Sequence, residues 1–330
     1  MSVGNIPQNN STIHVVFSSD DDYFVPTYIA IFSLLSNYKG TRNIIIYILC
    51  NGDYERKYTI YLKELKNVAT EFRLSFVFID MGNRYQNVRI CNNRISISTM
   101  YRLSIPNLLI DVSRCIYLDS DIIVEGDISE LYDVDLEKKL IAGVKDIYIS
   151  EKDRNRICTV LAISDMDHYF NAGVLLMDLD GIRKQHLDEK MELIGLSSDD
   201  YPYNDQDVMN SLFCENVKML SPRFNLPIAY INRVENIRHI SEYTISEQNP
   251  LIIHYISGIK PWKYPESIGA RYWWNYIKRI NDNFNHSIVD EFIYVEKKES
   301  FRRIKEFIIS ILIKTRILIP IKKLLRACLT

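Results

Sequence analysis

Two carboxylates one residue apart, Asp119 and Asp121, follow an apolar run that predicts a buried strand ending near Leu118. Two acids at the end of a core strand are costly unless a positive group lies between them. A divalent cation would meet that need, because hard cations bind carboxylate oxygens and can share the phosphates of a substrate. A surface turn that carries two acids would give the same short pattern. The spacing alone therefore leaves a metal site and a polar turn both open.

The elements that would position these acids alternate between strand and helix. This alternation predicts a parallel sheet with helices on both faces, which binds ligands at the carboxyl ends of its strands. We expect strands at 13–17, 43–50, 73–79, 114–118, 140–144, 170–177 and 251–255. We expect helices at 24–36, 53–70, 178–196, 204–214 and 272–280, with Asn204 as an N-cap. The weakly patterned stretch 147–168 reads as a long loop with helical pieces.

Composition excludes several classes of protein. The 330 residues, 47% of them hydrophobic, can form one large domain or two smaller ones, and a net charge of −2 argues against a nucleic-acid binder. Six cysteines form no C-x-x-C pair, which fits reduced thiols in a cytosolic protein. The polar N-terminus lacks a secretory pattern, and no uncharged apolar stretch approaches the roughly 20 residues that span a bilayer.

The composition changes after about residue 297. Ten Lys and Arg residues face only Glu299 and Glu306, and the apolar run 307–313 lies between the charges. A basic, apolar stretch of this kind suits the surface of an anionic membrane, and peripheral contact with such a membrane is our expectation. A C-terminal helix that packs its apolar side on the domain is the alternative.

Six segments, each at the end of a strand or helix, share the order of a known family. They are FSSDDDY (17–23), YRL (101–103), YLDSD (117–121), FNAGVLLMD (170–178), NDQD (204–207) and HYISGIKPW (254–262). Together they resemble the family 8 glycosyltransferases, retaining enzymes that use UDP-sugars. The resemblance runs from about residue 13 to 262. It implies an α/β fold of the GT-A type, with one Rossmann-like sheet and helices on both faces. The expected division is a flexible segment 1–11, a catalytic domain 12–285 and a membrane-associating region 286–330.

The resemblance implies that Asp119, Asp121 and His254 bind Mn²⁺ or Mg²⁺. The imidazole leans the site toward Mn²⁺. Lys260 would contact the leaving phosphates as a point charge. A structural histidine and a surface lysine are the alternatives for the last two residues.

The same resemblance assigns the acidic first loop to the nucleotide. Asp20 would accept a hydrogen bond from uracil, Tyr23 would stack on it, and Asp22 would lie near the ribose, in place of the usual Asn. A polar turn that caps the next helix, with Tyr23 in the core, is the alternative. The resemblance further places Ser18, Ser120, Ala172, Ser257 and Gly258 in the donor site. Since Ser257 stands where the family usually has Gly, the loop there must differ.

Five polar residues match positions that hold the hydroxyls of the donor sugar, which are costly to bury unpaired. They are Arg102, Asp146, Asn171, Asp205 and Gln206. The structural alternatives are an ion-pair partner for Arg102, a turn residue for Asn171 and a helix-cap neighbour for Asp205. Gln206 and Asp205 are the expected catalytic residues. An amide is a poor nucleophile, so we expect front-face attack in which they stabilise oxocarbenium-like charge.

The expected function is transfer of glucose or galactose from UDP-glucose or UDP-galactose to a saccharide acceptor. We expect lipopolysaccharide core or a lipid-linked glycan as acceptor, with the protein cytoplasmic at the membrane face. A non-catalytic nucleotide-sugar binder is the main alternative. A sugar-phosphate nucleotidyltransferase would need a Gly-rich, basic first loop, whereas the loop 18–22 is acidic.

Overall fold

The computed structural model describes residues 12–90, 96–149, 151–164, 166–197, 201–228, 243, 246 and 248–283. The predicted segment 1–11 and region 286–330, with its expected membrane contact, lie outside these residues. Across the part described, no helix has the length and apolar character needed to cross a membrane.

The first half of the chain alternates as predicted. Its elements are β1 (Thr12–Ser18), η1 (Asp21–Tyr23), α1 (Phe24–Asn37), β2 (Asn43–Cys50), α2 (Tyr54–Glu64), η2 (Leu65–Asn67) and β3 (Leu74–Asp80). A 3-10 helix η3 (Ile97–Ser104) and helix α3 (Ile105–Leu108) then lead to β4 (Arg114–Leu118).

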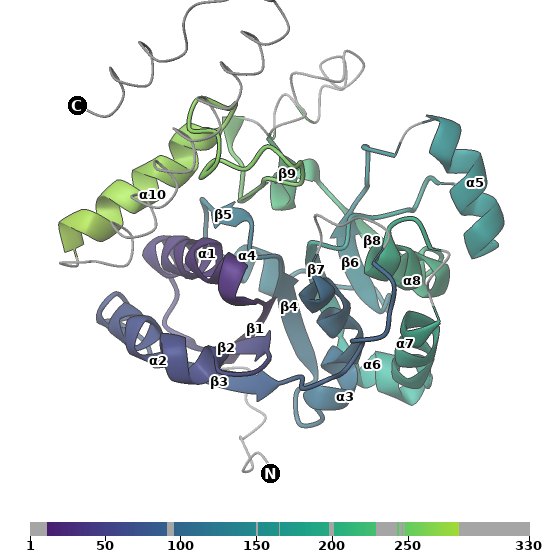
Figure 1. The fold of residues 1–330 in the computed structure, drawn as a ribbon, viewed down its shortest axis with the longest axis horizontal. Helices are drawn as coiled ribbons and strands as arrows, with labels where there is room; N and C mark the ends of the chain where they lie inside the picture. Colours follow the sequence, from purple (N-terminus) through teal and green to yellow (C-terminus); the bar gives the residue numbers. More distant parts are fainter. Residues whose placement is uncertain are drawn as a thin grey trace, which may run out of the picture.

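The second half contains more and shorter elements than predicted. They are β5 (Ile122–Val124), α4 (Ser129–Tyr132), β6 (Ile141–Val144), α5 (Glu151–Leu161), β7 (Val174–Asp178), α6 (Leu179–Lys184), α7 (Leu187–Leu196), α8 (Asn204–Phe213), β8 (Val217–Leu220), η4 (Pro222–Phe224), β9 (Leu226–Pro227), β10 (Ile252–His254) and α10 (Ala270–Asn283). The stretch 147–168 contains α5, which lies away from α10 in Figure 1.

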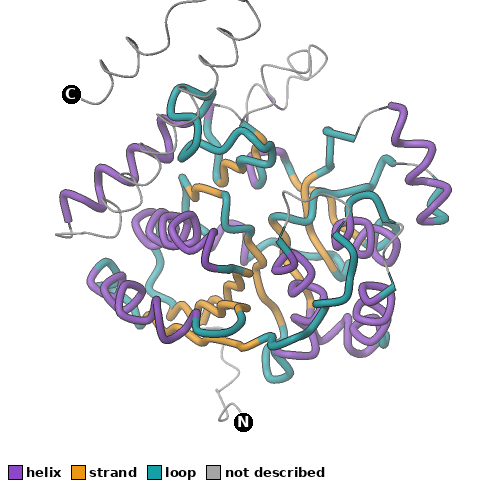
Figure 2. The backbone as a smooth tube through the Cα atoms, in the orientation of Figure 1, coloured by secondary structure: helices purple, strands orange, loops and turns teal. Residues whose placement is uncertain are grey.

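The main sheet has the strand order β3-β2-β1-β4-β7-β6-β8. Strands β1 to β4 run parallel, but β7 runs antiparallel to both β4 and β6. The prediction of an entirely parallel sheet is therefore wrong at β7. Because β7 is reversed, the residues that precede it, Asn171 to Gly173, lie beside the carboxyl end of β4. Figure 2 shows the strands between two groups of helices, as expected for an α/β fold.

A second sheet of three strands has the order β5-β10-β9. The expected Rossmann-like sheet corresponds to the main sheet, whereas this second sheet, which includes residues 122–124, was not predicted. Strand β10 runs antiparallel to β5, and His254 pairs with Ile122, next to Asp121. This register brings His254 close to Asp121, although the two residues are far apart in the sequence.

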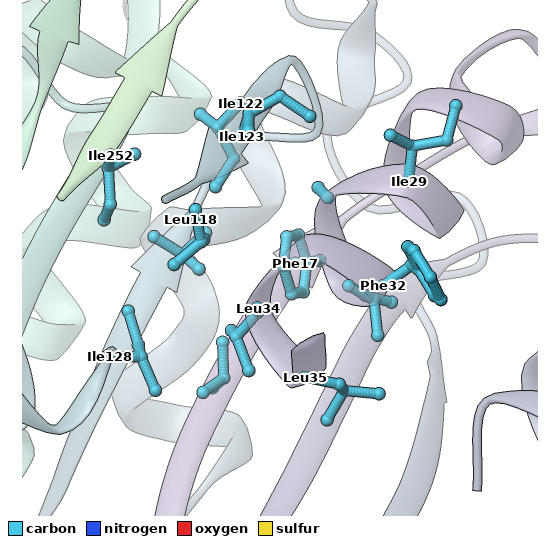
Figure 3. Packing of buried hydrophobic residues seen from close by; sticks show 14 of the residues in the cluster. Phe17, Ile29, Phe32, Leu34, Leu35, Leu118, Ile122, Ile123, Ile128 and Ile252 are labelled. Atoms are coloured by element: carbon cyan, nitrogen blue, oxygen red, sulfur yellow. The ribbon is translucent and has the colours of Figure 1, made fainter. Parts of the chain in front are cut away.

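Alternate residues of the central strands pack on opposite faces of the main sheet. Val15 and Phe17 of β1 and Leu118 of β4 join the cluster under α1, whereas Val16 and Tyr117 join the cluster on the other face. Each fully buried apolar side chain of this kind contributes about 1.5–3 kcal/mol. Figure 3 shows Phe17 and Leu118 close to α1 and to residues of β5. The packed core therefore holds the ends of β1 and β4 in place.

Asn204 does not cap α8 as predicted. The helix begins at Asn204 itself, whose φ is 44°, and its side-chain amide donates to the carbonyl of Arg89 at 3.0 Å. The carboxylate of Asp207 instead accepts the backbone N–H of Tyr203 at 2.7 Å. Among the described residues, no disulfide joins the four cysteines: Cys50, Cys115 and Cys214 are buried and Cys158 is partly buried.

Candidate functional site

Three predicted metal ligands meet between the two sheets. One ligand atom each of Asp119, Asp121 and His254 lies within 4.8 Å of the other two. His254 Nε2 is 3.2 Å from Asp121 Oδ1 and 3.7 Å from Asp119 Oδ2. Two carboxylate oxygens and one imidazole nitrogen are a donor set that suits Mn²⁺ or Mg²⁺. The residues present therefore fit the expected cation.

A glycine keeps this space open. A Cβ atom on Gly173 would lie 2.3 Å from His254 Cε1 and 2.5 Å from Asp119 Oδ2, which is closer than real contacts allow. The backbone here is also part of the sheet, since Asp119 N–H donates to the Gly173 carbonyl at 2.8 Å. Any larger residue at this position would displace two of the three ligands.

Lys260 lies beside the same cluster. Its ammonium group donates to Asp121 Oδ2 and to the carbonyl of Tyr255. Burial by itself would raise the pKa of Asp121, but Lys260 and His254 outweigh burial and hold this pKa well below the usual range. The carboxylate therefore stays ionised, as a metal ligand requires.

A buried arginine joins the metal cluster to the predicted catalytic residues. Arg102 pairs with Asp119 at 2.8 Å and with Asp205 at 2.8 Å, and its guanidinium lies 4.4 Å from the ring centre of Tyr117. Burial raises the pKa of Asp205 to about 6, although Arg102 and then Thr99 act in the opposite direction. Arg102 is thus an ion-pair partner within the site, which was one of its two predicted roles.

The amide of Gln206 is held from four directions. Its Oε1 accepts the backbone N–H of Ala172 and the side chain of Asn171, each at 3.1 Å. Its Nε2 donates to Asp146 at 3.0 Å and to the Tyr169 hydroxyl at 3.3 Å. Because Oε1 already accepts two hydrogen bonds, it is a still poorer nucleophile than a free amide. The network instead fixes the orientation of the amide.

The acidic first loop lies at the end of β1, near the metal cluster. Asp20 accepts the backbone N–H of Tyr23 at 3.1 Å and the Ser98 hydroxyl at 3.4 Å, so it does cap the following turn. Burial, and after it the carboxylates of Asp121 and Asp20, raise the pKa of Tyr23. The Tyr23 ring lies edge-on to Trp262, with centroids 6.1 Å apart, while the side chain of Asp22 is exposed.

The predicted small residues of the donor site support the loops. Ser120 donates to the Ser18 carbonyl at 2.9 Å, whereas Ser18 Oγ is buried with no hydrogen-bond partner among the described residues. Ser257 Oγ accepts the N–H of Ile259 at 3.1 Å, which closes a turn next to the exposed Gly258. The serine at position 257 thus stabilises the local turn.

Sequence reasoning missed several residues that orient the site. Thr99 and Tyr117 donate to Asp205 and Asp119, at 2.7 and 2.9 Å. Tyr169, which accepts from Gln206, donates to Asp207 at 2.6 Å. Tyr117 and Asp207 stand inside motifs already quoted, so their position was a usable signal. Asn225, which contacts His254 at 2.8 Å, carries no such signal.

Comparison with known sequences gives a consistent result. The family described as glycosyl transferase family 8 matches residues 14–266. General stress protein A of Bacillus subtilis (strain 168) is 27% identical over 264 residues, which are 77% of this chain and 89% of that protein. A lipopolysaccharide 1,2-glucosyltransferase of Escherichia coli (strain K12) is 26% identical over 253 residues, which are 76% of this chain and 72% of that protein.

Two solved structures of glycosyltransferases are also similar to this chain. The galactosyltransferase LgtC, in complex with donor and acceptor sugar analogues, is 26% identical with a TM-score of 0.65, and the match covers 80% of this chain and 95% of that one. The bifunctional glycosyltransferase WbbM has a TM-score of 0.71 at 23% identity. That match covers 88% of this chain and 53% of WbbM, so the chain spans about half of it. The likeness to WbbM concerns the fold alone, and it agrees with the predicted α/β fold of the GT-A type.

Proposed function

The chain belongs to glycosyl transferase family 8, and we propose that this glycosyltransferase moves glucose or galactose from a UDP-sugar to a saccharide acceptor with retention of configuration. The observation that carries the proposal is the convergence of Asp119, Asp121 and His254 on one point, with Lys260 beside them. Carboxylates that hold a divalent cation, with a lysine beside them, suit a diphosphate leaving group better than a neutral one.

The proposed donor position follows from the contacts. A Mn²⁺ or Mg²⁺ ion held by the three ligands would act as a Lewis acid that stabilises charge on the diphosphate. Lys260 would contact the same phosphates once it leaves Asp121. Tyr23 and Asp20, near the carboxyl end of β1, would hold the uracil, with Asp22 near the ribose. Ser18, Ser120, Ala172, Ser257 and Gly258 would line the donor site through backbone and hydroxyl groups.

The proposed reaction breaks the bond between the anomeric carbon and the phosphate oxygen and forms a bond from the same face to an acceptor hydroxyl. The departing phosphate oxygen takes the hydroxyl proton. Gln206 and Asp205 would stabilise positive charge on the sugar ring, with Arg102, Asp146 and Asn171 near its hydroxyls. The fixed Gln206 amide supports this route, because it can offer a preorganised dipole but no good nucleophile.

The direct test measures UDP release and product mass with UDP-glucose and UDP-galactose, each with Mn²⁺ or with a chelator. We expect metal-dependent turnover of one donor and a product heavier by one hexose when an acceptor is supplied. An Asp121→Asn variant should lose this turnover. Metal-dependent binding of UDP-sugar without any turnover would favour the non-catalytic binder instead.

The role of Gln206 has its own test. A Gln206→Ala variant should lose most of its kcat while it retains Mn²⁺ affinity, because the amide contacts no metal ligand directly. A Ser211→Ala variant, which removes another polar side chain from the same helix, is the matched control. Near-normal turnover by Gln206→Ala would remove Gln206 from the proposed mechanism.

The acceptor that we propose is lipopolysaccharide core or another lipid-linked glycan at the cytoplasmic face of the membrane. Two features support it: the basic, apolar composition after residue 297, and the similarity to a protein named as a lipopolysaccharide glucosyltransferase. In this proposal residues 12–285 carry catalysis and residues 286–330 make peripheral contact with anionic lipid.

A further inference from the structure

Asn225 is buried between the metal cluster and the Gln206 network. It follows η4 and directly precedes β9, whose parallel pairing with β10 brings it to His254. Its exposed fraction is 2%, and its side chain reaches His254 Nδ1 at 2.8 Å and Asn171 Oδ1 at 2.9 Å. One side chain therefore contacts both halves of the site.

The backbone determines which way this amide points. Asn171 Oδ1 accepts the N–H of Gly173 at 3.1 Å, so this atom must be the oxygen of Asn171. Asn225 therefore presents its NH₂ group to Asn171 and its oxygen to His254. An amide oxygen can only accept, so it favours the imidazole form with its hydrogen on Nδ1.

That form leaves the other ring nitrogen free to bind a metal. Nε2 points at the carboxylates, 3.2 Å from Asp121 Oδ1 and 3.7 Å from Asp119 Oδ2. A histidine that binds a metal through one nitrogen needs its hydrogen on the other, and a partner there fixes the ring.

We infer that Asn225 is a positioning residue that orients His254 for the divalent cation and connects it, through Asn171, to Gln206. The connection is direct, since Asn171 Nδ2 donates to Gln206 Oε1 at 3.1 Å. The amide oxygens of Asn171 and Gln206 each accept a backbone N–H, from Gly173 and Ala172 respectively. The inference rests on the proposed cation site.

The test measures Mn²⁺ affinity without donor, by electron paramagnetic resonance of the free ion, in a double-mutant cycle of Asn225→Leu and His254→Gln. We expect Asn225→Leu to weaken Mn²⁺ binding roughly 10–100-fold in the wild-type background. In the His254→Gln background it should have little further effect, because its route to the metal is gone. Equal weakening in both backgrounds, or no weakening in folded Asn225→Leu, would overturn the inference.

A second variant keeps the inference testable if Asn225→Leu does not fold. Asn225→Asp retains an acceptor for Nδ1–H but places a carboxylate against Asn171 Oδ1. It should keep Mn²⁺ affinity within about threefold of wild type while kcat falls. Loss of Mn²⁺ affinity by Asn225→Asp would contradict the inference.

The control is Asn37→Leu, which removes a partly buried amide whose Nδ2 contacts Ser33, Val124 and Tyr276. It should leave Mn²⁺ affinity unchanged, and a loss equal to that of Asn225→Leu would reduce the effect to general destabilisation. If the wild-type protein itself does not bind Mn²⁺, the proposed cation site fails, which is distinct from failure of the role of Asn225.

Discussion

Replacement of Asp205 by asparagine should change how the stability of the protein depends on pH. The Asp205 carboxyl lies between Thr99 and Arg102 with 7% of its side chain exposed. Burial opposes ionisation and the arginine favours it, and burial prevails, since the pKa rises from 3.8 to about 6. A buried ion pair in which desolvation exceeds attraction costs stability at neutral pH.

The sign follows from proton linkage. The folded protein binds the Asp205 proton more tightly than the unfolded chain, so its contribution to stability is complete below pH 3.8 and is lost as the pH rises through about 6. A shift of about two pKa units, at ~1.4 kcal/mol each, corresponds to at most about 3 kcal/mol. The amide introduced by Asp205→Asn cannot titrate, so the stability of this variant relative to wild type should rise by up to that amount between about pH 4 and pH 7.

Urea unfolding of both proteins at several pH values measures this difference directly. Asp53→Asn is the control, because Asp53 is exposed and Arg56 lowers its pKa, so any small change should have the opposite sign. If Asp205→Asn instead loses stability relative to wild type as the pH rises, then the pair with Arg102 is net stabilising. That result would refute the reasoning from burial.

Three further predictions concern other parts of the chain. Gly173→Ala should weaken Mn²⁺ binding roughly tenfold or more, whereas Gly143→Ala, whose added Cβ meets its nearest neighbours at 3.3 Å, should not; equal effects in a Mn²⁺ titration would contradict the steric argument. Burial lowers the pKa of His14 to about 4, so stability should fall as the pH drops from about 6.5 through 4, and His14→Phe should remove this dependence in urea unfolding. Deletion of 297–330 should preserve UDP-sugar hydrolysis and reduce sedimentation with anionic vesicles; undiminished sedimentation would disprove the proposed membrane contact.

Local sequence patterns were enough to predict most of the first half of the fold. The apolar runs that became β1 to β4 are bounded by acids and turn residues, so period and length identify them. The acids Asp119 and Asp121 were identified for the same reason, because charge at the end of a buried strand is unusual. His254 and Lys260 required the family resemblance, since nothing in the sequence near them points to position 119.

The features that were missed depend on contacts between distant parts of the chain. Strand β7 reads like any buried strand, and its direction is set by pairing with β4 and β6. Strand β5 is three residues long and looks like a continuation of β4, so a second sheet could not be inferred. Asn225 stands in a stretch with no periodic pattern, and its role comes only from the pairing of β9 with β10.

The boundary between the two sheets explains why a short acidic motif can form a site here. Asp119 extends the pairing of the main sheet, since its N–H donates to the Gly173 carbonyl. The carbonyl of Asp121 accepts the N–H of Tyr255, which directly follows β10 of the second sheet. Ser120 lies between them with only 6% of its surface exposed, and it is hydrogen-bonded to Ser18 and Thr27. Each carboxylate is therefore fixed by a different sheet. The same two acids in a surface turn would lack the backbone hydrogen bonds to both sheets. The geometry of the motif therefore depends on its place between the two sheets and not on its three residues alone.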